Sequence, residues 1–205
     1  MIKAKHHWFY SRFFNWYVPR ILKSDFHTIE IDGKWSDVGK PALIIGNHIS
    51  WWDGFWALYL NNLFLKKKFH AMMLEEQLRT RKFLSKTGAF SIDPGKRSMF
   101  ETLEYTVQLL ESPNNAVTVY PQGRIASMTS PLFEFGSAAD RILKKSPHVT
   151  VCFYAAFVDY FSERKPSLFF YLEQVDPKNV EAKGLAELYR DFYYRSVKNQ
   201  ATKAL

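Results

Sequence analysis

The sequence has almost no cysteine, no long apolar run and fewer acidic than basic residues. Its 205 residues include one cysteine, Cys152, so no disulfide can form within the chain and we expect a reducing compartment. No stretch reaches the roughly 18 consecutive apolar residues of a membrane-spanning helix. The six histidines show no ligand spacing with cysteines or paired carboxylates, so we expect no metal. Disulfide-stapled, membrane-spanning and metal-centred proteins are thereby disfavoured.

The charge balance and the aromatic content narrow the range of partners. Lys and Arg number 28 against 20 Asp and Glu, a formal charge of +8, which favours nucleic acid, anionic lipid or an acidic protein. Phe, Trp and Tyr make up 17% of the chain, which suits a protein at a water–lipid boundary. No nucleic-acid-binding motif is present, so we expect no nucleic acid partner. We expect the anionic partner to be a membrane surface.

Segments with strand and helix patterns alternate along the chain. Strands are expected at 27–31, 41–46, 66–73, 88–93, 116–120, 149–158 and 168–172, and helices at 53–65, 75–84, 98–110, 133–145 and 180–198. The first strand is followed by Asp32-Gly33, which indicates a hairpin or loop. This alternation predicts a single α/β domain over residues 25–205, with a largely parallel central sheet flanked by helices.

Residues 1–24 form a separate amphipathic segment with helical spacing of its aromatic residues. Pro19 is expected to break or kink this helix after Val18. Two interpretations are open: a helix docked on the core, or an interfacial helix that dips aromatic rings into a bilayer. The second interpretation makes the protein cytoplasmic and peripheral on the cytoplasmic face of the membrane. Its membrane-contacting candidates are Trp8, Phe9, Phe13, Phe14, Trp16 and Tyr17.

His48 and Asp53 are the candidate catalytic pair. The strand at 41–46 ends at Gly46, His48 follows in the next loop, and Asp53 stands at the expected start of a helix. A strand-to-helix turn can bring the imidazole and the carboxylate together, which predicts a general base and the acid that orients it. His27 and Asp32 have the same spacing but lie along one strand, where their side chains point to opposite faces. A buried core histidine is the alternative for His48.

Three polar loops follow expected strands and should meet at one edge of the sheet. They are Asn47-His48, residues 93–97 and residues 122–124. In parallel sheets the carboxyl ends of the strands gather the binding residues. We therefore expect these loops to surround one site.

Five segments resemble parts of a known family, four of them its motif blocks. Asn-His-Ile-Ser-Trp-Trp-Asp at 47–53 resembles the Asn-His-x-x-x-x-Asp signature of the lysophosphatidate (glycerolipid) acyltransferases. Gly-Ala-Phe-Ser-Ile-Asp at 88–93 is similar to the second block and Tyr-Pro-Gln-Gly-Arg at 120–124 to the third. Phe-Gly-Ser-Ala at 135–138 resembles the helix that follows, and the apolar run at 149–155 stands in place of the fourth block.

The resemblance implies an acyl transfer reaction. A fatty acyl group would pass from acyl-coenzyme A or acyl carrier protein to a hydroxyl of a lysophospholipid or related lipid, with no bound cofactor and no enzyme nucleophile. Backbone N–H groups near Gly123 are candidates to hold the oxyanion. The substrate-binding candidates are Asn47, Arg97, Gln122, Gly123 and Arg124. Candidates to line an acyl tunnel, or simply to pack in the core, are Trp51, Trp52, Phe55 and Trp56.

The chain departs from the family pattern at the positions expected to hold the acceptor. Pro94-Gly95-Lys96 stands between the second-block aspartate and Arg97, Gln122 replaces a glutamate, and Arg124 comes one position early. Arginines at these places suit a phosphate group. The acceptor could instead be a lipid without a glycerol phosphate. A noncatalytic lipid-binding protein and, with less support, a basic nucleic-acid-binding domain remain alternatives.

Overall fold

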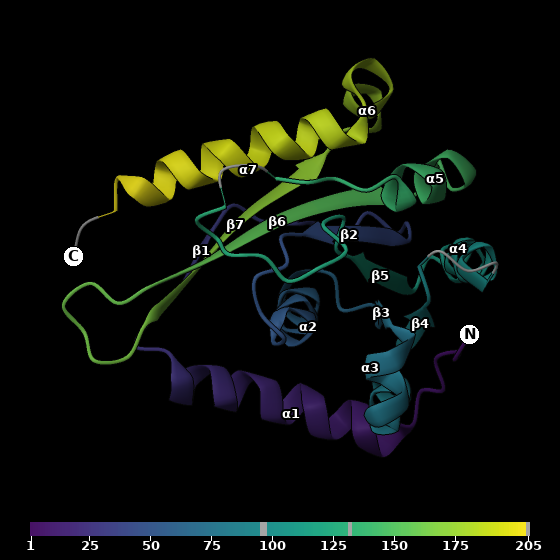
Figure 1. Ribbon diagram of the computed structural model, residues 1–205, viewed down its shortest axis with the longest axis horizontal. Helices are drawn as coiled ribbons and strands as arrows, with labels where there is room; N and C mark the ends of the chain where they lie inside the picture. The colour runs from purple at the N-terminus through teal and green to yellow at the C-terminus, as the bar shows by residue number, and fades with distance from the viewer. Residues whose placement is uncertain (95–97, 131–132, 204–205) are drawn as a thin grey trace.

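The computed structural model describes residues 1–94, 98–130 and 133–203. Within these ranges seven strands form one sheet in the order β1-β7-β6-β2-β5-β3-β4 (Figure 1). The strands are β1 (Ile29–Asp32), β2 (Ala42–Gly46), β3 (Lys68–Leu74), β4 (Ala89–Ile92), β5 (Asn115–Val119), β6 (Thr150–Asp159) and β7 (Ser167–Val175). Neighbouring strands are parallel except β6 and β7. The expected α/β fold with a largely parallel sheet is confirmed.

Helices cover both faces of the sheet. They are α1 (Trp8–Asp25), α2 (Asp53–Phe64), α3 (Glu75–Thr80), a 3-10 helix (Lys82–Thr87), α4 (Ser98–Leu109), α5 (Ala138–Lys145), α6 (Pro177–Lys183) and α7 (Leu185–Ala201). On one face α4, α5 and α7 pack over alternate residues of the central strands, including Leu43 and Ile45 of β2. On the other face α2 covers Ile44, and α1 lies outside α2. Because both faces are covered, every residue of β2 is buried, which is typical of a central parallel strand.

The strand expected at 27–31 does not lead into a hairpin. β1 runs parallel to β7, with Ile29 beside Leu168, so its partner lies far along the chain. At Gly33, just after β1, φ is +87°, and a Cβ there would come within 2.1 Å of the Leu172 carbonyl oxygen. Only glycine fits this close backbone approach, and the chain then turns away from the sheet.

Three expected helices also differ in the structure. The helix expected at 75–84 is divided into α3 and the 3-10 helix. The helix expected at 133–145 begins only at Ala138, and Phe133 is instead a buried loop residue. The terminal helix expected at 180–198 is divided into α6 and α7 at Gly184, whose φ is +83°. A glycine with positive φ ends the first helix there and lets the second start in a new direction.

The helix α1 continues through Pro19, and the expected break after Val18 is wrong. A proline inside a helix costs about 3 kcal/mol because it removes a hydrogen bond and crowds the preceding turn. Val18 and Leu22 on either side of it are buried, and each such burial contributes roughly 1.5–3 kcal/mol. Packing therefore offsets the loss.

The residues before α1 are bound to the edge of the sheet. The backbone N–H of Ile2 donates to Ser91 Oγ at 2.6 Å, and the N–H of Ser91 donates to the Ile2 carbonyl at 2.9 Å. Further along, the N–H of Lys5 donates to the Ser85 carbonyl at 2.8 Å. These bonds connect residues 1–7 to β4 and the 3-10 helix, so the amino-terminal segment is part of the packed fold.

Candidate active site

The loop between β2 and α2 brings His48 and Asp53 together. Nδ1 of His48 lies 2.7 Å from Oδ2 of Asp53. The same carboxylate oxygen accepts the backbone N–H groups of Ile49 at 2.7 Å and Ser50 at 3.0 Å. Asp53 is the first residue of α2, where the unpaired N–H groups and the helix dipole favour a negative charge. The turn that joins strand and helix therefore forms around this carboxylate.

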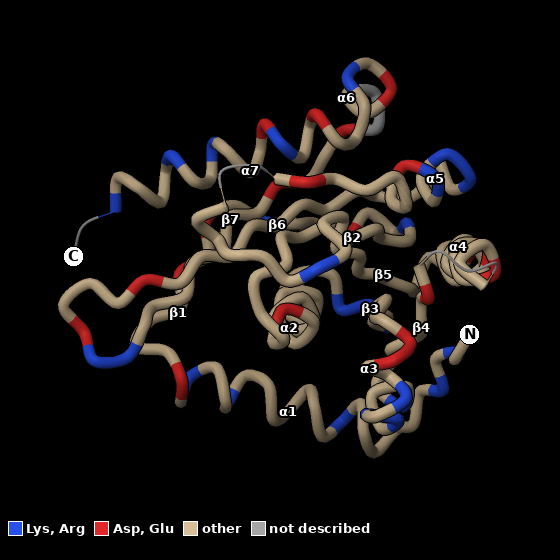
Figure 2. The backbone as a smooth tube through the Cα atoms, in the orientation of Figure 1, with Lys and Arg blue, Asp and Glu red and all other residues tan. Residues whose placement is uncertain are grey.

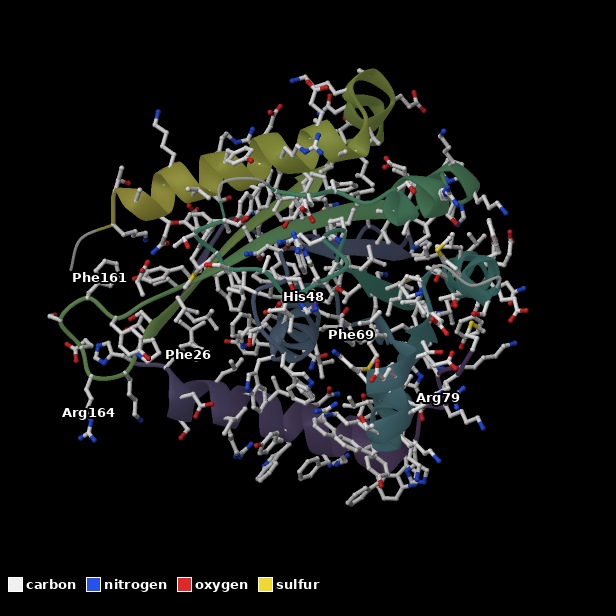
Figure 3. All side chains as sticks on the ribbon, in the orientation of Figure 1. Phe26, His48, Phe69, Arg79, Phe161 and Arg164 are labelled. Carbon is white, nitrogen blue, oxygen red and sulfur yellow. The ribbon has the colours of Figure 1, made fainter. Side chains whose placement is uncertain are left out.

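The two side chains differ in their exposure. The Asp53 side chain is fully buried, whereas the His48 side chain keeps 23% of its surface exposed. Burial raises the pKa of Asp53, and the hydrogen bonds from His48, Ser50 and Ile49 act in the opposite direction by favouring the carboxylate. Figure 3 shows His48 at the centre of the molecule beside α2. An accessible imidazole backed by a buried carboxylate can exchange a proton with a bound molecule.

The loop after β5 holds the backbone of His48 from the other side. Oε1 of Gln122 accepts the His48 backbone N–H at 2.6 Å, and the His48 carbonyl accepts the N–H of Ala126 at 2.8 Å. β2 and β5 are neighbours in the sheet, so their following loops meet as expected. Gln122, predicted to bind substrate, uses its carbonyl oxygen to position His48, a contact that a glutamate oxygen could also make.

Asn47 also has a structural contact. Its side-chain Nδ2 donates to the Ala156 carbonyl at 2.9 Å, and its Oδ1 accepts the Ala156 N–H at 2.8 Å. Asn47 is completely buried. This pair of bonds prolongs the pairing of β2 with β6 by one step through a side chain, so Asn47 fixes the start of the His48 loop.

Two tyrosines lie beneath the His48–Asp53 pair. The Tyr120 ring is stacked on the His48 imidazole, with centroids 4.5 Å apart and planes 18° apart. The hydroxyl oxygens of Tyr120 and Tyr154 are 3.1 Å apart, and the Tyr154 hydroxyl is 3.4 Å from the Asp53 backbone carbonyl. Sequence reasoning missed both roles, although a tyrosine in the otherwise apolar run 149–155 was a signal for Tyr154.

Gly46 makes room for Tyr154. The two residues are paired across β2 and β6, and a Cβ on Gly46 would lie 2.2 Å from the Tyr154 ring. Real Cβ atoms do not approach other atoms so closely, so the ring occupies the space of the missing side chain. The glycine that ends β2 is thus explained by a residue more than a hundred positions away.

The other predicted substrate residues do not all reach this site. The Arg124 guanidinium is exposed and pairs with Glu134 at 2.9 Å. The Gly123 N–H donates to the Tyr120 carbonyl at 3.1 Å, so this one group is engaged within the turn, and an oxyanion role for the other backbone N–H groups near Gly123 stays a prediction. Arg97 lies outside the described residues. β4, which precedes residues 93–97, is separated from β5 by β3.

The aromatic cluster after His48 is divided between the surface and the core. Trp51, Trp52 and Phe55 contact one another at centroid distances of 5.4–5.5 Å and are partly exposed. Trp56 is buried against Phe26 and Phe170. Trp56 therefore packs in the core, which was one of the two interpretations, while the other three line the surface beside the His48 loop.

The aromatic residues of α1 are divided in the same way. Trp8, Phe9, Phe13 and Trp16 are 40–75% exposed, and Tyr17 is partly exposed. Phe14 is a correction: its ring is buried, stacked on Phe55 and Phe83. A ring enclosed in this way belongs to the interior and cannot reach a bilayer. None of the helices in the described part of the chain is both long and apolar enough to cross a membrane.

The second His-x-x-x-x-Asp spacing serves as an internal control. His27 lies 3.6 Å from Glu163, in the hairpin between β6 and β7, while Asp32 ends β1.

Within the described ranges, no three His, Cys, Asp or Glu side chains gather closely enough to hold a metal ion.

The comparisons with known proteins identify the family and the fold of the chain. The family model described as Acyltransferase matches residues 23–157, about two thirds of the chain, from just before β1 to near the end of β6. The chain belongs to the acyltransferase family. The predicted membership of the glycerolipid acyltransferase family is thereby confirmed. No curated protein matches the chain.

A solved structure similar to this acyltransferase family member is the 1-acyl-sn-glycerophosphate (LPA) acyltransferase PlsC from Thermotoga maritima. The two chains share 14% sequence identity with a TM-score of 0.68, and the match covers 94% of this chain and 80% of the other. At this identity the likeness establishes a common fold. This family member and PlsC thus share nearly the whole architecture.

Proposed function

We propose that the protein transfers a fatty acyl group from an acyl thioester to a hydroxyl of a lysophospholipid or related lipid at a membrane surface. His48 acts as the general base and Asp53 orients it. The observation that carries the proposal is the 2.7 Å contact between His48 Nδ1 and the buried Asp53 carboxylate. A carboxylate at this distance accepts the Nδ1 proton, which leaves the lone pair on Nε2 free to accept another.

The reaction proceeds without a covalent enzyme intermediate. The acceptor oxygen attacks the thioester carbon while His48 Nε2 removes the hydroxyl proton. The carbon–sulfur bond then breaks, and the thiolate leaves with the proton returned by the imidazolium. Asp53 stabilises the imidazolium through Nδ1, and its own N–H donors from Ile49 and Ser50 hold the carboxylate in place. Proton, acyl group and thiol are balanced without any other reactant.

The acyl donor is acyl-coenzyme A or acyl carrier protein. Both are anionic, and the chain carries a formal charge of +8. Figure 2 shows Lys and Arg gathered at the amino-terminal segment and around α3. Arg81 of this region lies 5.3 Å from the Trp51 ring centroid, beside the surface aromatic cluster that follows His48. Either anionic donor would be attracted to this side.

In this proposal the lipid acceptor binds through the Arg124 guanidinium, which contacts another side chain of the protein when no lipid is present. Arg124 pairs with Glu134, and both side chains are more than 60% exposed. An exposed pair of this kind contributes little stability. A lipid phosphate can therefore replace Glu134 as the partner of the guanidinium, which forms paired hydrogen bonds to phosphate oxygens.

The exposed aromatics of α1 bind the membrane surface. Trp8, Phe9, Phe13 and Trp16 are exposed on a helix that also carries Arg12 and Arg20. Such rings enter the headgroup boundary while basic side chains attract anionic lipids. Deleting residues 1–24 would also remove buried Phe14, Val18 and Leu22, so point substitutions are the better test.

The catalytic proposal is tested with labelled acyl thioester and a panel of lysolipids. We expect the wild-type protein to acylate at least one acceptor, and His48→Ala to lose at least about a hundredfold in rate. His27→Ala, at the other His-x-x-x-x-Asp spacing, serves as the matched control and should keep the wild-type rate. Transfer that survives in His48→Ala would refute the mechanism. Lipid binding without transfer to any acceptor would favour a noncatalytic lipid-binding protein.

Membrane binding is tested by flotation with anionic vesicles. A variant with serine at positions 8, 9, 13 and 16 should float poorly, whereas Phe100→Ser should float like the wild type. Phe100 is 58% exposed on α4, so it controls for loss of an exposed ring. Equal flotation of both variants would reject the role of α1.

A further inference from the structure

The imidazole of His48 has an aromatic neighbour as well as a carboxylate. Tyr120 is the first residue after β5, and His48 follows β2, the adjacent parallel strand. This arrangement lays the Tyr120 ring almost flat on the imidazole, with 18° between the planes and 4.5 Å between the centroids. The Asp53 contact is made at the ring nitrogen Nδ1, whereas the Tyr120 contact covers one face of the imidazole.

The Tyr120 ring is itself held in place from inside the protein. Its hydroxyl lies 3.1 Å from that of Tyr154, whose side chain is fully buried. The Tyr154 hydroxyl is 3.4 Å from the Asp53 carbonyl oxygen, and the Tyr154 backbone carbonyl accepts the Tyr189 hydroxyl at 2.8 Å. Burial raises the pKa of the Tyr120 and Tyr154 hydroxyls well above the usual value. Both therefore remain neutral and serve as hydrogen-bonding groups.

We propose that Tyr120 is a positioning residue for His48, which keeps the imidazole in contact with the Asp53 carboxylate and stabilises the imidazolium formed during proton transfer. The inference deepens the proposed function and rests on His48 acting as the base. The face of an aromatic ring carries partial negative charge and attracts a cation placed over it. The stacked ring also prevents rotation of the imidazole about its Cβ–Cγ bond, which would break the Nδ1 contact.

The two parts of Tyr120 have separable roles. The ring supplies the face that contacts the imidazole, and the hydroxyl anchors the ring to Tyr154. Tyr120→Phe removes the anchor and keeps the face. Tyr120→Leu removes the face and keeps an apolar side chain in the same partly exposed position. Comparison of the two variants isolates the effect of the stacking.

The test measures kcat and KM against pH, and follows the His48 ring signal by NMR over the same pH range. His48→Ala identifies that signal. We expect Tyr120→Leu to lower the pH midpoint of the His48 titration and of the acidic limb of kcat/KM by roughly half a pH unit, since the imidazolium loses an attraction of about 0.5–1 kcal/mol. In the same variant kcat should fall about tenfold with KM changed less than about twofold. Tyr120→Phe should keep the wild-type midpoint of the His48 titration and most of the wild-type kcat.

Tyr105→Leu is the matched control for loss of a partly buried ring. Tyr105 is on α4, where its ring packs edge-on against Phe90 of β4 and has no contact with His48. The Tyr105→Leu variant should have a lower thermal midpoint of unfolding and an unchanged midpoint of the His48 titration. A wild-type midpoint in Tyr120→Leu, by NMR, would overturn the inference even if the rate falls, because it would leave Tyr120 a merely structural role. The NMR titration requires no substrate, so this outcome is distinct from failure of the proposed acyl transfer, which His48→Ala tests.

Discussion

Oδ2 of Asp53 accepts three hydrogen bonds, one from His48 Nδ1 at 2.7 Å and two from the N–H groups of the loop that joins the two residues. The carboxylate therefore shapes the loop as well as orienting the imidazole. A residue that serves both purposes should respond to substitution in activity and in stability, and the two effects can be measured separately.

Asp53→Asn tests the orienting role. The amide can present its NH2 group to Nδ1, which favours the wrong tautomer, so the rate of acyl transfer should fall by roughly 10²–10⁴. Asp32→Asn, from the spacing that does not bring its residues together, should retain the wild-type rate. Initial rates with labelled thioester give the comparison, with circular dichroism to verify folding. A rate within threefold of wild type in Asp53→Asn would contradict the assignment.

Gly46→Ala tests the space occupied by Tyr154. The new Cβ would lie 2.2 Å from the ring, so the ring must move, at a cost of about 1–3 kcal/mol for overpacking. Gly54→Ala is the matched control, because nothing lies within 4 Å of its Cβ and alanine favours a helix by up to about 1 kcal/mol. Urea denaturation should show opposite signs for the two variants. Equal free energies of unfolding for the two variants would show that the position of the Tyr154 ring does not require a glycine at position 46.

Gln122→Leu and Gln122→Glu test the contact with the His48 backbone. Leucine leaves the partly buried N–H without its acceptor, which costs about 1–3 kcal/mol, and should slow acyl transfer by loosening the loop. Glutamate retains an acceptor oxygen and should preserve the unfolding midpoint more closely. Rates and chemical denaturation are measured for both. Full activity in Gln122→Leu would exclude a role for this hydrogen bond.

Phe13→Ala and Phe14→Ala compare adjacent residues on opposite sides of α1. Phe14 is 8% exposed and stacked on Phe55 and Phe83, so its loss should destabilise the fold by about 3 kcal/mol. Phe13 is 40% exposed, so Phe13→Ala should lower the free energy of unfolding by less than about 1 kcal/mol. Thermal unfolding measures both. Equal destabilisation would contradict the docked position of α1.

Because His70 is buried, we expect the folded protein to lose stability in acid. Burial, followed by the neighbouring His6 and Lys68, lowers the pKa of His70 to about 3 against a smaller opposing effect of a hydrogen bond with Asn115. The unfolded chain takes up a proton near pH 6.5, whereas the folded protein does not until about pH 3. Stability therefore falls as pH decreases through this window, by roughly 2 kcal/mol between pH 7 and pH 5.

The measurement for His70 is the urea unfolding free energy against pH. His70→Leu should show a shallower dependence than the wild type over pH 5–7, whereas exposed His27→Gln should retain the wild-type slope. Parallel curves for His70→Leu and the wild type would remove His70 as the cause.

Much of the architecture was predictable from local pattern. The alternation of apolar strands and helices indicated the α/β fold, and the position of Asp53 at a helix start indicated that it could meet His48 across a short loop. Both depend on residues close in the chain, where backbone geometry limits the arrangements. The helix limits at Gly184 and Ala138, and the parallel partner of β1, were missed because the local pattern allows several solutions among which packing selects one.

The contact between His48 and Asp53 could be predicted from the sequence, because five residues across a strand-to-helix turn suffice to bring the two side chains together. Their surroundings depended on the order of the strands. β2 lies between β5 and β6, and only this order places Tyr120 on the imidazole, Tyr154 over Gly46 and Gln122 against the His48 backbone. Packing of α1 against α2 and the 3-10 helix directs Phe14 inward, while Phe13 remains exposed. Contacts between residues so distant along the chain are established by packing of the whole sheet, and no local periodicity encodes them.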